Sequence, residues 1–153
     1  DNNFQLGYTE HHSRDFKQML FDFSDFSEVR LYIMNDKKAS TFEFQLIIPE
    51  DDFVEWIKTN DEYIPHNKIE KMNLLKAVAK ILWNSLEILA IQTAWECSDY
   101  PPKAKHISSK TKPQIEPFCI IKESSIIDKL GLPFEKVGQN GVLIEDYDNW
   151  NYL

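Results

Sequence analysis

Hydrophobic residues in the first third of the chain follow a helical spacing and then an alternating one. In residues 13–23 the hydrophobic residues recur at intervals of three and four, and Ser13 precedes them as a favourable helix N-cap. This pattern predicts a short amphipathic helix. Residues 29–34 and 41–48 alternate apolar and polar positions around the turn-forming segment NDKKAS, which predicts an antiparallel hairpin. The hydrophobic positions are Phe16, Met19, Leu20 and Phe23 in the helix, and Phe42, Phe44, Leu46 and Ile48 in the second strand.

A second helix is predicted to begin after Pro49. Proline suits the first turn of a helix, and the carboxylates that follow it would meet the positive end of the helix dipole. Three apolar residues recur at helical spacing and should face the core, namely Phe53, Trp56 and Ile57. The same geometry directs four carboxylates towards solvent, those of Asp51, Asp52, Glu55 and Glu62. The acidic cluster is therefore interpreted first as a helix start and only second as a functional surface.

The longest helical pattern covers residues 67–95 and has two apolar stripes, which makes its hydrophobic face wider than a coiled-coil seam. We therefore expect a central helix packed on a sheet, with dimerisation through the helix as the alternative. The stripes consist of Met72, Leu75, Ala79, Leu82, Leu86 and Leu89, and of Leu74, Val78, Ile81 and Ile88. Residues 98–117 lack apolar periodicity and are rich in proline and lysine, which predicts a long exposed loop.

The C-terminal part alternates short apolar runs with turn signals. Residues 117–121 have the pattern of a buried strand, SSIIDKLG that of a short capped helix closed by Gly131, and GQNG that of a turn. A terminal strand, or a hairpin turning at Asp148 and Asn149, should follow. The order of elements predicts the α+β class, an antiparallel sheet with helices packed mainly on one face. We expect a single domain over residues 1–153, with a loose N-terminal segment over residues 1–12.

Composition supports a folded domain, and the charge is unevenly distributed. A chain of 153 residues with 42% hydrophobic residues can bury a substantial core. Residues 1–62 contain 14 acidic and 6 basic residues, a net charge of -8, whereas residues 63–153 contain 11 of each and are neutral. Such a field disfavours direct binding of nucleic acid and steers basic partners towards the protein. Acidity that serves solubility alone is the alternative.

Two cysteines and the apolar runs bear on the compartment. Cys97 and Cys119 flank the predicted loop and are either two free thiols, as expected in the cytoplasm, or a disulfide, as expected in an oxidising compartment. No apolar run is long enough to cross a membrane. Because the sequence begins at Asp1 without methionine, a removed leader or lipid anchor is an alternative. The compartment stays open, with the cytoplasm favoured over a periplasmic or lipid-anchored location.

A search for catalytic chemistry gives no assigned site. His11, His12, His66 and His106 do not have the spacing of metal ligands, and the four glycines form neither a phosphate-binding loop nor a dinucleotide fingerprint. His106 lies between the two cysteines in sequence, which is only a weak indication of a thiol–imidazole pair. We therefore expect no metal, no cofactor and no enzymatic activity.

Binding surfaces have better support, because carboxylates recur beside aromatic residues, a combination that protein interfaces favour. The leading hypothesis is a small acidic inhibitor, such as an immunity protein that neutralises a basic bacterial toxin, for example a nuclease, acting as a monomer or dimer. The alternatives are an exported or lipid-anchored binding domain and an enzyme of unrecognised type. The candidate partner-binding residues are Asp51, Asp52, Glu55, Glu62, Asp99, Tyr100, Glu145, Asp146, Tyr147, Asp148 and Trp150.

Overall fold

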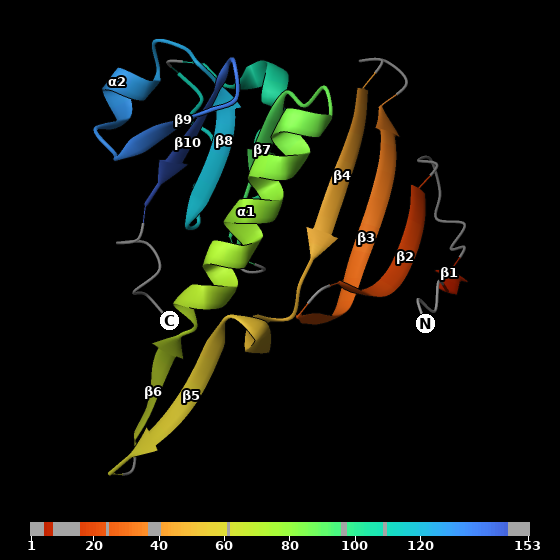
Figure 1. Cartoon of the computed structure of the whole chain (residues 1–153), viewed down its shortest axis with the longest axis vertical. Coiled ribbons are helices and arrows are strands. Elements are labelled where there is room, and N and C mark those ends of the chain that lie inside the picture. Colours follow the sequence, from red (N-terminus) through yellow and green to blue (C-terminus); the bar gives the residue numbers. More distant parts are fainter. Residues whose placement is uncertain are drawn as a thin grey trace. The chain divides into compact units, whose positions relative to one another are not determined.

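Among the residues that the structure describes, the computed structural model has two α-helices and strands that pair mostly antiparallel (Figure 1). The α+β class is confirmed in this coarse form. The chain divides into two compact units, unit 1 (residues 1–72) and unit 2 (residues 73–153). The expectation of a single domain stays a prediction. The structure describes residues 5–7, 16–23, 25–36, 41–60, 62–95, 98–108 and 110–146.

Unit 1 contains a four-stranded antiparallel sheet in the order β1-β2-β3-β4. Its strands are β1 (Gln5–Gly7), β2 (Phe16–Phe23), β3 (Phe26–Asp36) and β4 (Thr41–Ile47). The pairing of β3 with β4 confirms the predicted hairpin, with Asp36 opposite Thr41 and Arg30 opposite Ile47. The predicted helix over residues 13–23 is wrong, because residues 16–23 form strand β2, which pairs with β3 and places Phe23 opposite Phe26. Pairing with a neighbouring strand overrides a helical spacing this short.

The predicted helix after Pro49 is also wrong beyond its first turn. Residues Glu50–Asp52 form a single 3-10 turn, η1, and the chain then enters a hairpin of β5 (Val54–Thr59) and β6 (Glu62–Asn67). Asn60, at the tip, has a positive φ of 48°. Asparagine tolerates this left-handed conformation, which a two-residue hairpin turn requires. The β-branched and aromatic residues of VEWIKT favour the extended form.

A small apolar core holds the base of this hairpin in unit 1. Phe26, Val29, Phe53 and Val54 are buried, and the rings of Phe26 and Phe53 lie 5.5 Å apart at an angle of 39°. The backbone N–H of Lys68 donates to the Phe53 carbonyl (2.7 Å), which closes the open end of the hairpin. The hairpin is thus fixed at one end by buried aromatic packing and a backbone hydrogen bond.

Unit 2 is built around a sheet in the order β7-β8-β10-β9. Helix α1 (Ile69–Ser85) begins in unit 1 and continues into unit 2, where it ends ten residues earlier than the pattern over residues 67–95 predicted. It stops there because the chain after Ser85 joins the sheet as β7. The other elements are β7 (Ala90–Gln92), η2 (Ala104–His106), β8 (Phe118–Lys122), α2 (Ile127–Leu130), β9 (Phe134–Val137) and β10 (Gly141–Glu145).

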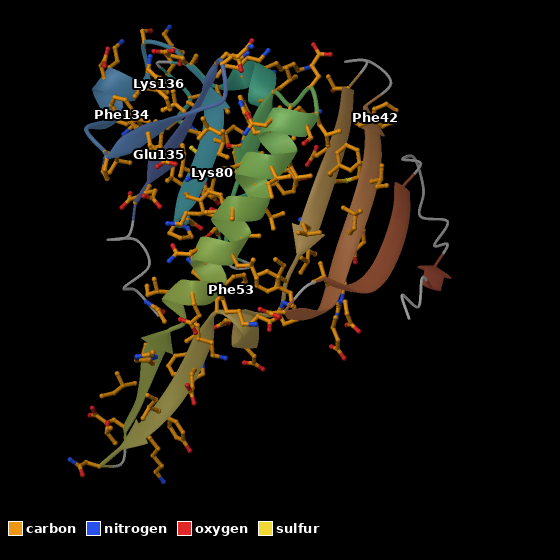
Figure 2. All side chains as sticks on the ribbon, in the orientation of Figure 1. Phe42, Phe53, Lys80, Phe134, Glu135 and Lys136 are labelled. Atoms are coloured by element: carbon orange, nitrogen blue, oxygen red, sulfur yellow. The ribbon has the colours of Figure 1, made fainter. Side chains whose placement is uncertain are left out.

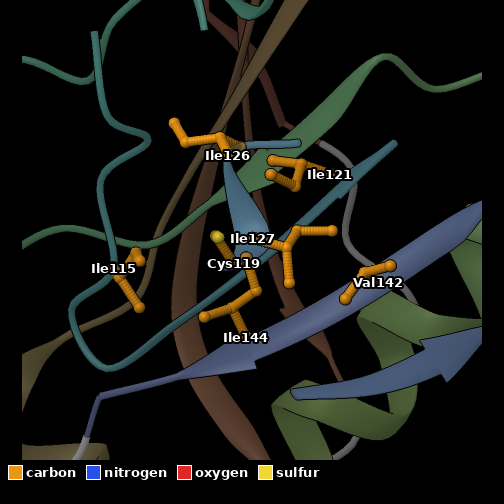
Figure 3. Close-up of a cluster of buried hydrophobic side chains, with 7 residues drawn as sticks. All are labelled: Ile115, Cys119, Ile121, Ile126, Ile127, Val142 and Ile144. Atoms are coloured by element: carbon orange, nitrogen blue, oxygen red, sulfur yellow. The ribbon is translucent and has the colours of Figure 1, made fainter. Parts of the chain in front are cut away.

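Both faces of the central strands of this sheet are covered. On one face, side chains of β8 and β10 form a buried cluster with Ile126 and Ile127 at the start of α2 and with Ile115, which precedes β8 in the chain (Figure 3). On the other face, Trp83 of α1 lies over Gly141, so close that a Cβ added there would be 2.6 Å from the Trp83 Cε2 atom. The two helices therefore lie on opposite faces, which corrects the expectation of helices on one face. The cluster comprises Ile115, Cys119, Ile121, Ile126, Ile127, Val142 and Ile144.

The remaining C-terminal predictions are confirmed where the structure describes them. The apolar runs FCII and GVLIE form buried strands, and α2 ends at Gly131 with a positive φ of 66°. Residues 138–140 form the predicted turn. Both faces of this part of the sheet are buried, so side chains pointing to either face are apolar. The sequences of these strands are therefore continuous apolar runs and do not alternate with polar residues. The turn predicted at Asp148 and Asn149 lies outside the described residues.

The segment 98–117 is only partly the exposed loop that was predicted. Its last residues are buried, including Ile115 and Pro117. The Glu116 carboxylate accepts hydrogen bonds from the Trp95 backbone N–H (3.0 Å) and from the side chains of Ser98 and Gln114. These bonds tie the two ends of the segment together, an arrangement that a lack of periodicity does not reveal.

Candidate functional site

The β5–β6 hairpin exposes large apolar side chains that usually lie in a core. Exposed fractions are 46% for Trp56, 43% for Ile57, 63% for Tyr63 and 51% for Ile64. Figure 1 shows β5 and β6 side by side, and together they form a sheet of two strands. Trp56 and Ile57 were predicted to lie in a helix and to face the protein core. The structure corrects this prediction, because both residues lie in a two-stranded ribbon that has no second layer to bury them.

Strand register divides the hairpin side chains between two faces, because residues directly opposite each other share a face. Trp56 pairs with Pro65, and Lys58 pairs with Tyr63, so these four residues form an aromatic face. The Lys58 ammonium lies 5.9 Å from the centre of the Tyr63 ring, within the range of a cation–π contact. The aromatic face thus already carries a cation of its own.

The opposite face combines carboxylates with aliphatic side chains. Ile57 pairs with Ile64 at its centre, Glu55 pairs with His66 on one side, and Glu62 pairs with Thr59 on the other. We call Glu55, Ile57, Glu62 and Ile64 the acidic–aliphatic face. All of its side chains are exposed. An aliphatic centre between two carboxylates can bury apolar surface and pair with cations at the same time.

Two more carboxylates precede the hairpin directly. Asp51 is exposed and Asp52 is half-buried, and both belong to η1, whose carbonyl at Asp51 accepts a hydrogen bond from the Lys68 side chain (2.7 Å). Four of the predicted partner-binding residues therefore fall in one short segment: Asp51, Asp52, Glu55 and Glu62. Sequence reasoning missed Ile64 and Tyr63 altogether. The alternation in EYIPHN and the Asn-Asp pair before it were the available signals for a hairpin.

The other predicted binding residues belong to unit 2, and some have structural roles there. Asp99 and Tyr100 are exposed. Glu145 is half-buried and forms an ion pair with Lys76 of α1 at 2.5 Å, and the Asp146 backbone N–H donates to the Pro117 carbonyl (2.8 Å). Figure 2 shows Lys80 on α1 and Glu135 on β9, which form another ion pair along the same helix. Tyr147, Asp148 and Trp150 lie outside the described residues.

Cys119 is a free thiol in the apolar cluster of unit 2, where no solvent reaches it. Burial disfavours the charged thiolate and raises the pKa of Cys119 to about 12. At neutral pH the sulfur is therefore protonated and a poor nucleophile. His106 lies in η2 and is exposed. Cys97, its predicted disulfide partner, lies outside the described residues.

We expect Cys119 to react very slowly with iodoacetamide at pH 8 in the folded protein and rapidly after unfolding. Alkylation needs a deprotonated thiol that the reagent can reach. Burial keeps the Cys119 thiol protonated and also blocks the reagent. The rate is measured by mass spectrometry on a Cys97→Ser variant, so that only one thiol is counted. Cys119→Ser provides the matched control for the other thiol. Labelling of folded Cys97→Ser at the rate of the unfolded chain would contradict the buried position.

Neither a cluster of metal-binding side chains nor a helix that could span a membrane is found in the part of the chain that the structure describes. No three side chains of the types that bind metals come together there. No helix among the same residues is long and apolar enough to span a bilayer.

Comparisons with known proteins add no further assignment. The sequence matches no protein-family model, and neither the curated proteins nor the solved structures give a match. The geometry and charge of the hairpin are therefore the features from which a function is inferred.

Proposed function

We propose that this protein is a small acidic inhibitor that neutralises a basic protein, such as a bacterial toxin, by direct binding, in the manner of an immunity protein. The observation that carries the proposal is the acidic–aliphatic face of the β5–β6 hairpin. An apolar centre with polar groups around it is the usual arrangement of a protein interface. The hairpin is the docking element, and inhibition follows because the docked protein covers the active surface of the toxin.

The hairpin gains apolar burial from such a complex. A two-stranded ribbon alone is marginally stable in water, and this one leaves its central isoleucines half in solvent. Full burial of an isoleucine side chain contributes about 1.5–3 kcal/mol. A partner that covers Ile57 and Ile64 therefore provides the second layer that unit 1 itself does not provide for this ribbon.

Charge determines which partners fit. Residues 1–62 carry a net charge of -8, and two of the carboxylates counted there are exposed on the acidic–aliphatic face, at the proposed point of contact. A basic surface is attracted over a distance and then paired on contact, which raises the association rate more than the final affinity. Nucleases are basic at their active sites because they bind phosphate, and they suit this proposal for that reason.

The first test is capture of a partner from the source cells. The immobilised protein is exposed to lysate and eluted with a salt gradient, and the eluted proteins are identified by mass spectrometry. We expect a basic protein that elutes with salt and is lost with the variant Glu55→Lys/Glu62→Lys. The matched control is Glu70→Lys/Glu87→Lys, which changes the net charge equally at exposed positions outside the hairpin.

The second test separates inhibition from mere binding. The activity of the captured protein, for example cleavage of nucleic acid, is titrated with the wild-type chain and with both variants. We expect complete inhibition at one equivalent of wild type and of the control, and a strongly right-shifted curve for the hairpin variant. Equal capture of both variants, or a captured protein that stays active when bound, would overturn the proposal.

A further inference from the structure

Strand β4 is an edge strand of the sheet in unit 1, and exposed edges of this kind can pair with other strands. It ends the order β1-β2-β3-β4, so the backbone groups on its outer side have no partner strand in that sheet. Its pairing with β3 runs through seven consecutive residue pairs without a register shift, so no bulge turns the strand away. Two of its phenylalanines are exposed, Phe42 at 65% and Phe44 at 64% (Figure 2 labels Phe42).

The other edges among the described strands carry features that discourage pairing. β1 and β7 are only three residues long. β6 contains Pro65, which has no N–H to donate. β5 and β9 each carry two charged side chains, Glu55 and Lys58 in β5 and Glu135 and Lys136 in β9. β4 has seven residues, a single charged side chain at Glu43 and no proline or glycine. It is therefore the edge best suited to strand addition in the part of the chain that the structure describes.

We infer that β4 pairs antiparallel with β4 of a second copy of this chain and that Phe44 lies at the two-fold axis. This register uses all seven residues of the strand. It places Phe42 opposite Leu46 of the second copy, and Phe44 opposite its own equivalent, so the apolar face of the sheet continues across the junction. Aromatic cross-strand pairs of this kind are among the more stabilising ones.

The polar face of the strand favours the same register. With Phe44 at the centre, the Glu43 carboxylate lies opposite Gln45 of the second copy, whose side-chain N–H groups can donate to it. Moving the centre by one residue to Glu43 would place two carboxylates opposite each other, which is unfavourable. The charge of Glu43 is therefore compatible with self-pairing centred on Phe44 and opposes self-pairing centred on Glu43.

Salt should act on this dimer in the opposite direction from its action on a complex with a basic protein. The dimer brings together two copies of residues 1–62, each with a net charge of -8, so repulsion opposes the dimer at low ionic strength. Added salt screens that repulsion and strengthens the dimer, whereas it weakens the attraction between an acidic inhibitor and its target. Self-association can therefore be tested independently of the proposed function.

The experiment measures the dissociation constant of the dimer by analytical ultracentrifugation at low and moderate salt. We expect Gln45→Lys to tighten the dimer and Gln45→Glu to weaken it, each by about 2- to 30-fold, because each substitution creates two cross-strand charge pairs. Gln139→Lys and Gln139→Glu, in the exposed β9–β10 turn, change the net charge equally and are the matched controls. Shifts no larger than those of the Gln139 variants would overturn the register.

Hydrogen exchange locates the contact on the same samples. We expect amide protection in residues 41–47 to rise with protein concentration, because the outer N–H groups of β4 gain partners in the dimer. A chain that stays monomeric at every concentration and salt level would overturn the inference. A dimer whose protection appears elsewhere, with β4 exchanging as in the monomer, would overturn it as well.

Discussion

Replacing Phe118 by alanine is expected to lower the free energy of unfolding by about 3–5 kcal/mol, as is typical for fully buried phenylalanines. Phe118 begins β8 and is 1% exposed. The sheet is covered on both faces, so the cavity left by the ring cannot be filled by solvent or by a simple shift of the strand. A loss of this size is a large part of the total stability of a small domain.

The matched control is Phe134→Ala. Phe134, which Figure 2 labels, is in β9 of the same sheet. It is 53% exposed. The same chemical change there should alter the stability by no more than about 0.5 kcal/mol, as at most surface positions. Urea denaturation followed by circular dichroism measures both variants. Equal losses for the two would mean that the buried and exposed assignments within unit 2 are incorrect.

Reversing three carboxylates at the start of the hairpin is expected to slow binding of the proposed basic target by about 10- to 100-fold at low salt. The variant Asp51→Lys/Asp52→Lys/Glu55→Lys changes the charge of this segment by six and leaves Ile57 and Ile64 in place. The association rate should fall far more than the dissociation rate rises, because long-range attraction acts before contact. Stopped-flow mixing with the captured target measures both rates.

An amide series provides the control for this prediction. Asp51→Asn/Asp52→Asn/Glu55→Gln changes the charge by three, keeps the size of each side chain and should slow association to an intermediate extent. The three proteins should converge at high salt, where the attraction is screened. Rates that are the same for all three at low salt would remove this segment from the proposed interface. Circular dichroism should show that each variant keeps the wild-type fold.

Local patterns predicted the elements that depend on local chemistry. Gly131 after an apolar run marked the end of α2, and the apolar segments FCII and GVLIE marked strands that are buried on both sides. Phe42 and Phe44 alternate clearly with polar residues, so the β3–β4 hairpin was predicted as well. In each case a few adjacent residues contain the physical cause of the structure.

Elements that depend on distant partners could not be predicted in this way. The eight residues of β2 fit a helical spacing as well as a strand, and only pairing with β3 decides between them. Trp83 was absent from both predicted stripes of α1 and yet is buried, because Gly141, far along the chain, has no side chain to keep the indole away. The carboxylates of the hairpin were predicted to face solvent, but their grouping around Ile57 and Ile64 requires the strand register.

The positions of two tryptophans give the chain a built-in optical readout. Trp83 is enclosed between α1 and β10, whereas nearly half of Trp56 is in water at the hairpin. Indole fluorescence shifts to longer wavelength in polar surroundings, so the emission of Trp83 follows the integrity of unit 2 and that of Trp56 follows events at the hairpin. Single-tryptophan variants would therefore let a loss of folding and a change at the proposed docking element be distinguished in one cuvette, without any attached dye.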